Sequence, residues 1–267
     1  MIDFEKNSYT VVKGLIEPEW CKTLYNYVGY SADRCGLKQK HDEEKYREAW
    51  DGTFQDKQCP GNYAHYGDPM MDSMMMAHGK KIEEVTGMTL APSYTYYRMY
   101  LNGAILKRHK DRPSCEISAT ICIEQDTDNG KPWPIWLLNN KNYAGYKYEP
   151  LFALSQKKSL SDRRLIGCKE ISMNPGDVLL YQGINVLHWR DPLEGNFSKN
   201  IFVHYVDKNG PLFMQNPSLK FDGRKSIFDG YDAKFQNYQS VVDLNARSEN
   251  DPDWLAGIAA AGISNID

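Results

Sequence analysis

The spacing of hydrophobic positions changes after the first third of the chain. In that part, apolar residues recur at helical spacing over residues 18–30 and again over 70–85, where the stripe is rich in methionine. Residues 31–68 between them are polar and are punctuated by glycine and proline, which predicts mostly loop. The pattern therefore predicts a helical layer over residues 15–90.

Beyond this layer, short β-branched and aromatic runs alternate with turn-forming residues. Many short strands that follow a helical layer predict a mainly β protein with flanking helices, in which a jelly-roll core has helices packed outside one sheet. We place this core at residues 92–207. Its predicted strands lie at residues 94–101, 115–123, 133–138, 171–173, 178–182 and 200–206.

The C-terminal part of the chain loses this pattern. Residues 211–267 are irregular and rich in glycine, asparagine and aspartate, and only residues 253–261 have the character of a helix. We therefore expect one domain over residues 1–210, followed by a C-terminal extension over 211–267 that packs on the barrel or is partly mobile. The long stretch 139–169, between predicted strands, is expected to act as a lid or specificity element.

Composition and charge narrow the classes of protein that fit. The 267 residues carry a formal net charge of −3, so no overall positive field draws the protein to nucleic acid or anionic lipid. The N-terminal residues lack the basic-then-apolar layout of a secretory signal, and no apolar run approaches the roughly 18 residues that span a bilayer. The six cysteines form no Cys-x-x-Cys pair and are expected to be reduced thiols. We expect a cytoplasmic protein with no nucleic-acid or membrane partner.

Two histidines and an aspartate form the candidate metal site. His109 and Asp111 are two positions apart just after a predicted strand, so period-two alternation points both side chains to one face. A tight turn and a buried strand over residues 174–183 then lead to His188, which basic groups follow. Two neutral imidazoles and one carboxylate on one face of an octahedral ion leave three positions open, as a non-haem Fe(II) oxygenase requires. A structural zinc site would rather use thiolates and close its coordination sphere.

The residues around this pair carry a resemblance to a known family. Residues 100–111 contain the run Tyr-x-x-Gly-x-x-Leu-x-x-His-x-Asp, which resembles a motif of the prolyl-4-hydroxylase-like branch of the iron(II)- and 2-oxoglutarate-dependent oxygenases. That branch typically has a second tyrosine where this chain has Leu106. Residues 9–16 also resemble the start of those catalytic domains, and the likeness covers roughly residues 8–206.

This resemblance implies a fold and a chemistry. The fold is a double-stranded β-helix of the jelly-roll or cupin-like kind. The cofactors are Fe(II), 2-oxoglutarate as co-substrate and O₂, with ascorbate as an additional reductant. The implied activity is that of a dioxygenase that hydroxylates a C–H bond, with release of succinate and CO₂. The branch favours a prolyl residue in a peptide, or a free amino acid, as the substrate.

Carried over position by position, the resemblance assigns site residues. His109, Asp111 and His188 become the iron ligands. Tyr100 falls where the family has a tyrosine that lines the co-substrate pocket. Thr120 is similar to a pocket threonine on the next strand, and alternation places Ser118 and Cys122 on its face.

The far carboxylate of 2-oxoglutarate needs a cation, and three residues compete for that role. Lys199, on the strand that follows the distal histidine, is the closest match to the family. Arg190 is the second candidate, because its planar fork suits a carboxylate better than an ammonium group does. Arg98 shares a strand face with the pocket tyrosine and is the third. His204 lies an odd number of positions after Lys199, so strand alternation points the two side chains to opposite faces. We therefore expect His204 to face the outer side of the barrel.

Two other classes of function fit parts of the pattern. A non-catalytic jelly-roll module would keep the barrel without the chemistry. A cupin-type metal hydrolase or isomerase usually offers three histidines with a glutamate, and this chain has no His-x-His pair. The nucleic-acid demethylase branch of the superfamily relies on paired arginines and a basic groove, and neither is evident here. A peptide, protein or small-molecule substrate remains the expected partner.

Overall fold

A computed structural model describes residues 3–41, 51–139 and 167–224 of the chain. The contacts within the chain divide it into two compact units, residues 1–222 and 223–267. The structure described below is that of the first unit. The expected helix over residues 253–261 and most of the expected lid over 139–169 lie outside the described residues.

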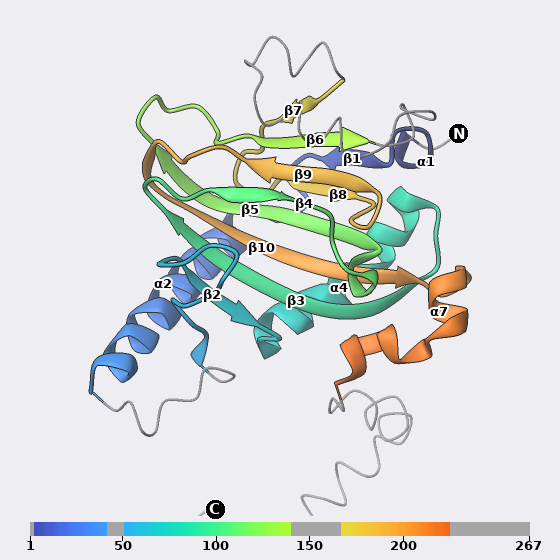
Figure 1. The fold of residues 1–267 in the computed structure, drawn as a ribbon, viewed down its shortest axis with the longest axis horizontal. Coiled ribbons are helices and arrows are strands. Elements are labelled where there is room, and N and C mark those ends of the chain that lie inside the picture. The colour runs from blue at the N-terminus through green and yellow to red at the C-terminus, as the bar shows by residue number, and fades with distance from the viewer. Residues whose placement is uncertain (1–2, 42–50, 140–166, 225–267) are drawn as a thin grey trace, which may run out of the picture. The chain divides into compact units, whose positions relative to one another are not determined.

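Two antiparallel sheets form the body of the molecule (Figure 1). The larger sheet has six strands in the order β1 (Tyr9–Val12), β8 (Val178–Tyr181), β5 (Ile117–Thr127), β10 (Gly195–Asp207), β3 (Leu90–Leu101) and β2 (Tyr63–Tyr66). The smaller sheet has four, in the order β4 (Leu106–His109), β9 (Val186–Arg190), β6 (Ile135–Asn139) and β7 (Lys169–Ile171).

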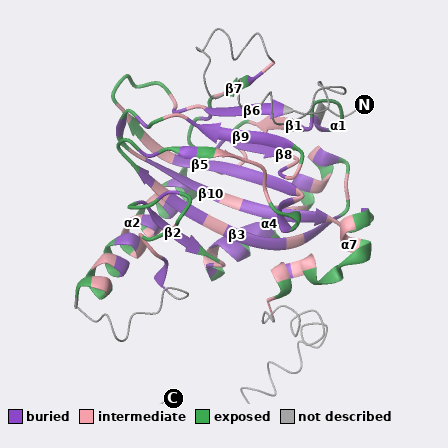
Figure 2. Cartoon of the chain, viewed as in Figure 1, coloured by how far each residue is buried: buried purple, intermediate pink, exposed green. Residues whose placement is uncertain are grey.

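The two sheets face each other across a shared apolar core. Leu179 and Tyr181 of the larger sheet pack in one buried cluster with Ile135, Leu137 and Val186 of the smaller sheet. Because successive strand residues point to opposite faces, this cluster fixes which positions point into the barrel. The strands are largely buried (Figure 2). The predicted mainly β fold with a jelly-roll core is confirmed.

Helices cover the outer face of the larger sheet. They are α1 (Asp3–Asn7), α2 (Pro18–His41) and α4 (Pro69–Thr86), and α2 and α4 pack against β5, β3 and β10. The start of α4 is set by Asp68, whose side chain accepts hydrogen bonds from the first backbone N–H groups. Its end is set by Gly87, at a φ of 72° that glycine adopts without strain. Helices α2 and α4 include the segments over which the sequence predicted helices, residues 18–30 and 70–85.

The prediction of mostly loop over residues 31–68 was wrong at both ends. Helix α2 continues to His41, because the small buried residues Ala32 and Cys35 extend its apolar stripe. Strand β2 occupies the other end of the segment and pairs with β3. The pattern failed here because small side chains carry a weak hydrophobic signal.

Two short segments follow the barrel, the helix α7 (Pro211–Gln215) and η3 (Pro217–Gly223), a 3₁₀ segment in which residues 220–222 have non-helical backbone angles. Residues 211–222 belong to the same compact unit as the barrel. The predicted domain boundary at residue 210 stays a prediction. No helix of the described residues has the length and apolar character needed to cross a membrane.

Candidate metal centre

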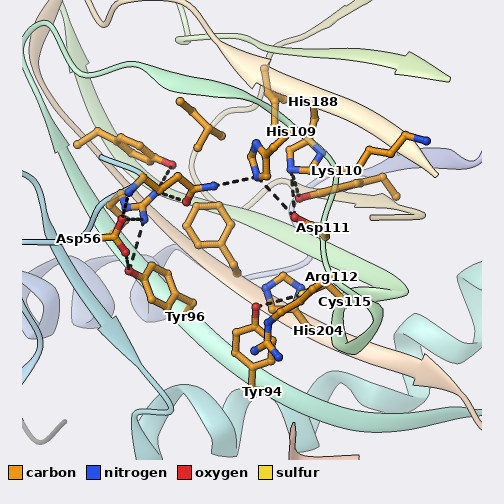
Figure 3. A pocket seen from close by; sticks show the side chains of 17 residues that line it. Asp56, Tyr94, Tyr96, His109, Lys110, Asp111, Arg112, Cys115, His188 and His204 are labelled. Atoms are coloured by element: carbon orange, nitrogen blue, oxygen red, sulfur yellow. Dashed lines mark hydrogen bonds and ion pairs between the residues drawn. The ribbon is translucent and has the colours of Figure 1, made fainter. Parts of the chain in front are cut away.

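Strands β4 and β9 bring the predicted metal ligands together. They are paired so that His109 lies opposite His188, and the two ring centroids are 4.2 Å apart. Asp111 follows β4, and its Oδ1 atom lies 3.5 Å from the Nε2 atom of each histidine. Figure 3 shows the two rings side by side next to the carboxylate. The candidate ligand atoms of the three residues all lie within 4.8 Å of one another.

Backbone carbonyls fix the orientation of both imidazoles. Nδ1 of His109 is 2.7 Å from the carbonyl oxygen of Lys107, and Nδ1 of His188 is 3.0 Å from that of Val186. Because a carbonyl oxygen only accepts, each Nδ1 carries a hydrogen, and Nε2 is the ring atom left to bind a metal. Burial and the neighbouring His188 lower the pKa of His109 to about 4, which keeps this ring neutral at neutral pH. Both Nε2 atoms lie on the side of Asp111 Oδ1, as a shared metal site requires.

A hydrogen bond holds the carboxylate oxygen of Asp111 that does not face His109 and His188. This oxygen, Oδ2, accepts a hydrogen bond of 2.8 Å from Ser118, and Ser118 lies 3.0 Å from Nδ1 of His204. Since the carboxylate only accepts, the serine hydroxyl donates to it and His204 donates to the serine. Burial acts to raise the pKa of Asp111, but His188 and the other histidines outweigh it and lower this pKa. Oδ1 is therefore left as the ligand oxygen.

Gly183 makes room for this arrangement. Its carbonyl oxygen accepts a hydrogen bond of 3.0 Å from the backbone N–H of Asp111. A Cβ atom at this position would collide with the side-chain oxygens of Asp111 and Ser118 and with the carbonyl oxygen of Cys115. Only glycine lets this backbone approach the ligand carboxylate so closely.

A pocket of about 290 Å³ opens onto these three residues. One wall is aromatic, and the rest carries polar and charged groups beside a few apolar ones. The pocket is lined by Asp56, Gln58, Tyr94, Tyr96, Arg98, Tyr100, Leu106, His109, Lys110, Asp111, Arg112, Cys115, Ile135, Tyr181, His188, Phe202 and His204. It thus has the mixed lining of a small-molecule or side-chain site.

Arg98 lies in the pocket wall with its charge matched by a carboxylate. Its Nη2 atom is 3.1 Å from Asp56 Oδ1, and its Nη1 atom donates a hydrogen bond of 3.0 Å to Gln58 Oε1. Tyr96 donates a short hydrogen bond to the same carboxylate. Gln58 in turn lies 3.0 Å from His109 Nε2, so its amide donates to that lone pair. The group formed by Asp56, Gln58 and Arg98 links the loop before β2 to the metal centre.

Arg190 is not part of the pocket lining; it is buried deeper in the barrel and has no carboxylate partner among the described residues. It donates hydrogen bonds of 2.6 Å to the carbonyl oxygen of Trp133 and of 3.2 Å to Oδ1 of Asn200. Burial lowers its pKa, and Tyr100 and Tyr181, which line the pocket, partly counter this effect. Within the described chain, Nε of Arg190 has no hydrogen-bond partner. A buried cation with only neutral acceptors is a candidate anion site.

The other two predicted co-substrate residues differ in placement. Tyr100 lines the pocket, and its ring packs edge-on against Trp133 with centroids 5.0 Å apart. Thr120 is fully buried beside Tyr181, whose hydroxyl it contacts, and it is not part of the pocket lining. Tyr100 is therefore a neighbour of Arg190, whereas Thr120 is a neighbour of Tyr181.

The structure does not bring Lys199 to the pocket. Its Nζ atom donates a hydrogen bond of 2.9 Å to the carbonyl oxygen of Tyr25 and lies 3.6 Å from the centroid of that ring, so it faces α2. The expectation that His204 faces outward was wrong, because this residue lines the pocket. Lys199 and His204 do point to opposite faces of β10, as predicted. The predicted faces were exchanged, because Lys199 points outward to α2 and His204 points into the pocket.

Gln58 was not among the site residues predicted from the sequence. It lies in a segment predicted as loop, and it reaches the centre because Asp56 fixes the loop locally. The Asp56 side chain accepts hydrogen bonds of 2.7 and 3.2 Å from the backbone N–H groups of Gln58 and Cys59. Such an Asx turn has a recognisable residue type at its start, but nothing in the sequence shows which pocket it faces.

Comparisons with known proteins agree with this fold. No protein-family model matches the chain, and no curated protein matches it significantly in sequence. Solved structures do match. HygX from Streptomyces hygroscopicus, with nickel and 2-oxoglutarate bound, has a TM-score of 0.55 at 11% identity over 78% of this chain and 85% of HygX. The non-haem α-ketoglutarate-dependent carbocyclase SnoK from nogalamycin biosynthesis has a TM-score of 0.51 at 10% identity, over 76% of this chain and 81% of SnoK.

A prolyl-4-hydroxylase from Pseudomonas putida is also among the matched structures, with a TM-score of 0.49 at 13% identity over 77% of this chain and 95% of that one. At these identities the likeness shows the fold. The chain has the jelly-roll fold of the iron(II)- and 2-oxoglutarate-dependent oxygenases, and the resemblance drawn from residues 100–111 is confirmed at that level.

Proposed function

We propose that this protein is an iron(II)- and 2-oxoglutarate-dependent dioxygenase that hydroxylates a C–H bond. The observation that carries the proposal is the placement of His109 Nε2, His188 Nε2 and Asp111 Oδ1 around one point at the base of a pocket. Two imidazoles and one carboxylate are the ligand set of non-haem Fe(II) oxygenases.

The residues present fit such a metal. Both rings present Nε2 as the ligand atom, because the Nδ1 atoms donate to backbone carbonyls. Ser118 holds Oδ2 of Asp111 and leaves Oδ1 for the metal. The Gln58 amide, which donates to His109 Nε2, gives up this contact when a metal takes that lone pair. The three protein ligands leave further positions open toward the pocket.

Arg190 is proposed as the residue that binds the far carboxylate of 2-oxoglutarate. It is a buried cation without an acidic partner in the described chain, and Tyr100 and Tyr181 lie in its surroundings. Arg98 already has Asp56, and Lys199 faces α2. When bound, the iron with 2-oxoglutarate and O₂ supplies the oxidation of the substrate, and 2-oxoglutarate leaves as succinate and CO₂. Ascorbate as an additional reductant belongs to the same proposal.

The substrate is proposed to be a prolyl residue in a peptide or a free amino acid. Sequence resemblance supports this choice. The aromatic wall formed by Tyr94, Tyr96 and Phe202 also offers apolar surface to a pyrrolidine ring or an aliphatic side chain. Proline-containing peptides and free proline, supplied separately, distinguish the two options by the hydroxylated product.

The test is oxygen-dependent conversion of 2-oxoglutarate to succinate by protein loaded anaerobically with Fe(II), with and without candidate substrates. We expect succinate from the wild type and none from His109→Ala, His188→Ala or Asp111→Ala. His78→Ala is the matched control, because His78 lies on α4 outside the pocket and should leave turnover unchanged.

Three outcomes would contradict the proposal. Full turnover by Asp111→Ala would remove that residue from the ligand set. A wild type that binds neither Fe(II) nor 2-oxoglutarate would favour a non-catalytic jelly-roll binding module. Activity that needs zinc or nickel and proceeds without O₂ would favour a cupin-type hydrolase or isomerase.

A further inference from the structure

One carboxylate from the segment after the barrel is bound at the rim of the metal centre. Asp222, in η3, accepts hydrogen bonds of 2.6 Å from Nη1 and from Nη2 of Arg112. Ser114 and Tyr66 each donate a further hydrogen bond of 2.6 Å to it. We call these four residues the Asp222 clamp. Arg112 binds with both arms of its guanidinium, which is the strongest geometry for an arginine and a carboxylate.

The backbone that carries Asp222 is held in an unfavourable conformation. Phe221 and Asp222 have φ values of 51° and 54°, in the left-handed region that non-glycine residues avoid. The side chain of Phe221 is buried, at 2% exposure, and that of Asp222 is 13% exposed. Consecutive left-handed residues persist only where surrounding contacts determine them. The position of this carboxylate is therefore specified by the fold.

Arg112 connects the clamp to the metal ligand that precedes it. It follows Asp111 directly, and its guanidinium lies 4.4 Å from the centroid of the Tyr94 ring. That ring packs against His204, with centroids 4.5 Å apart, and His204 bonds Ser118, which holds Asp111. Figure 3 shows Arg112, Tyr94 and His204 gathered next to Asp111. Two routes, one through the backbone and one through side chains, join the clamp to the ligand.

From this geometry we infer that Asp222 is a positioning residue for the metal centre. By binding Arg112 and Ser114, it fixes the loop of residues 109–115, which we call the metal loop, and so sets the position of the Asp111 carboxylate. The inference rests on the proposed function, because it assumes that a metal binds there. The segment after the barrel, in which the sequence shows no recognisable chemistry, thus completes the site.

A purely structural role for the same contacts predicts something different. An ion pair that only held the segment in place would change the unfolding midpoint and leave metal affinity intact. Surface ion pairs in general contribute little to stability. Partners that orient a metal ligand change the affinity for the metal itself, by about 10- to 100-fold when they are removed. Metal affinity therefore separates the two roles.

The test measures the dissociation constant for Co(II), added alone as a spectroscopic substitute for Fe(II), in full-length protein. We expect Asp222→Asn to weaken binding about tenfold, the lower end of that range, because Asp222 acts through Arg112. Asp222→Glu should recover part of the affinity. The matched control is Asp51→Asn: Asp51 is also buried and pairs with Arg34 and Lys38, but it does not line the pocket.

A second variant keeps the inference testable if the first one does not fold. If Asp222→Asn does not fold, Tyr66→Phe removes one of the four hydrogen bonds and should weaken Co(II) binding by a smaller factor. Combining Asp222→Asn with Arg112→Lys should give less than the product of the two single effects, because both act on one contact. Folded Asp222→Asn with wild-type affinity would overturn the inference alone. A wild type that binds no Co(II) would overturn the proposed function, and the inference with it.

Discussion

Two buried arginines stand near the same tyrosine, and their charges are balanced in different ways. Arg98 donates to the Tyr100 hydroxyl over 3.4 Å and has the Asp56 carboxylate 3.1 Å from its other arm. Arg190 interacts electrostatically with the same tyrosine, but its hydrogen-bond acceptors are the Trp133 carbonyl and the Asn200 amide. Both are almost fully buried, so exposure does not distinguish them.

The two arginines also differ in whether neighbouring groups outweigh the effect of burial on the pKa. Burial acts to lower the pKa of Arg98, but Tyr100, Tyr96 and Asp56 outweigh it and raise this pKa. Burial dominates at Arg190 and lowers its pKa. A buried charge without a counterion is costly. A ligand that supplies the missing charge would remove this cost, which supports the proposal that Arg190 binds the far carboxylate of 2-oxoglutarate.

The largest expected effect comes from removing Arg190, the buried cation that has no carboxylate partner in the described chain. Arg190→Met should weaken 2-oxoglutarate binding about 100-fold, since a bidentate, charge-assisted contact contributes roughly 3 kcal/mol. The measurement is 2-oxoglutarate affinity of the metal-loaded protein. The free energy of unfolding should stay the same or rise, because an apolar side chain replaces a buried charge.

Lys199→Met is the control for this variant, because Lys199 faces α2. It should leave 2-oxoglutarate binding unchanged. If Lys199→Met lost affinity while Arg190→Met kept it, the assignment of the two cations would have to be exchanged.

The second-largest expected effect comes from removing Arg98, the cation whose charge Asp56 balances. Arg98→Met should lower the free energy of unfolding by about 2 kcal/mol, because it leaves the Asp56 carboxylate, still partly solvated, without its counterion. Chemical denaturation measures this effect. A 2-oxoglutarate affinity that fell as far as in Arg190→Met would erase the distinction between the two arginines.

A smaller effect should follow from making the two arginines alike. Asp56→Asn removes the carboxylate and should lower the free energy of unfolding by about 1 kcal/mol. Arg98 would then be a buried cation without an acid, as Arg190 is. Added inorganic phosphate should therefore stabilise this variant more than it stabilises the wild type, as judged by the unfolding midpoint. Equal stabilisation of both proteins would show that charge balance at Arg98 does not control anion binding.

The smallest effect concerns Arg112, another arginine whose charge is matched by a carboxylate. Burial acts to raise the pKa of Asp222, but the hydrogen bonds from Arg112, Ser114 and Tyr66 outweigh it and lower this pKa to about 2. Since an unfolded aspartate titrates near pH ~3.9, the ionised clamp stabilises the fold above that pH and loses its contribution as the pH falls toward 2. The difference in unfolding free energy between wild type and Asp222→Asn should therefore shrink over this range. A constant difference would mean that the charge of Asp222 does not matter.

Some of these features follow from the sequence alone. The alternation after residue 92 predicted a mainly β jelly roll, and the helix over 70–85 corresponds to α4. The spacing of His109 and Asp111 and the later His188 identified three residues that the structure does bring together. Local periodicity and residue type suffice here, because a strand's alternation and a ligand's chemistry are properties of short segments.

The strands that carry the metal centre were not among those predicted. Strands β4 and β9 are short, and their residues are basic or histidine as often as apolar, so no alternation marks them. Their pairing, which places His109 opposite His188, depends on contacts between segments far apart in the chain. Strand pairing of this kind is decided by which faces are buried in the finished barrel.

Only the tertiary structure decided which face of its strand each side chain occupies and which charged groups form pairs. Sequence parity related Lys199 to His204, but the helices that cover the larger sheet determine which of the two faces inward. Likewise, the sequence contains Asp56, Arg98, Arg190 and Asp222 without showing which cation has a carboxylate. Electrostatic balance is a property of positions in space, and contacts such as Arg112 with Asp222, 110 residues apart, exist only after folding.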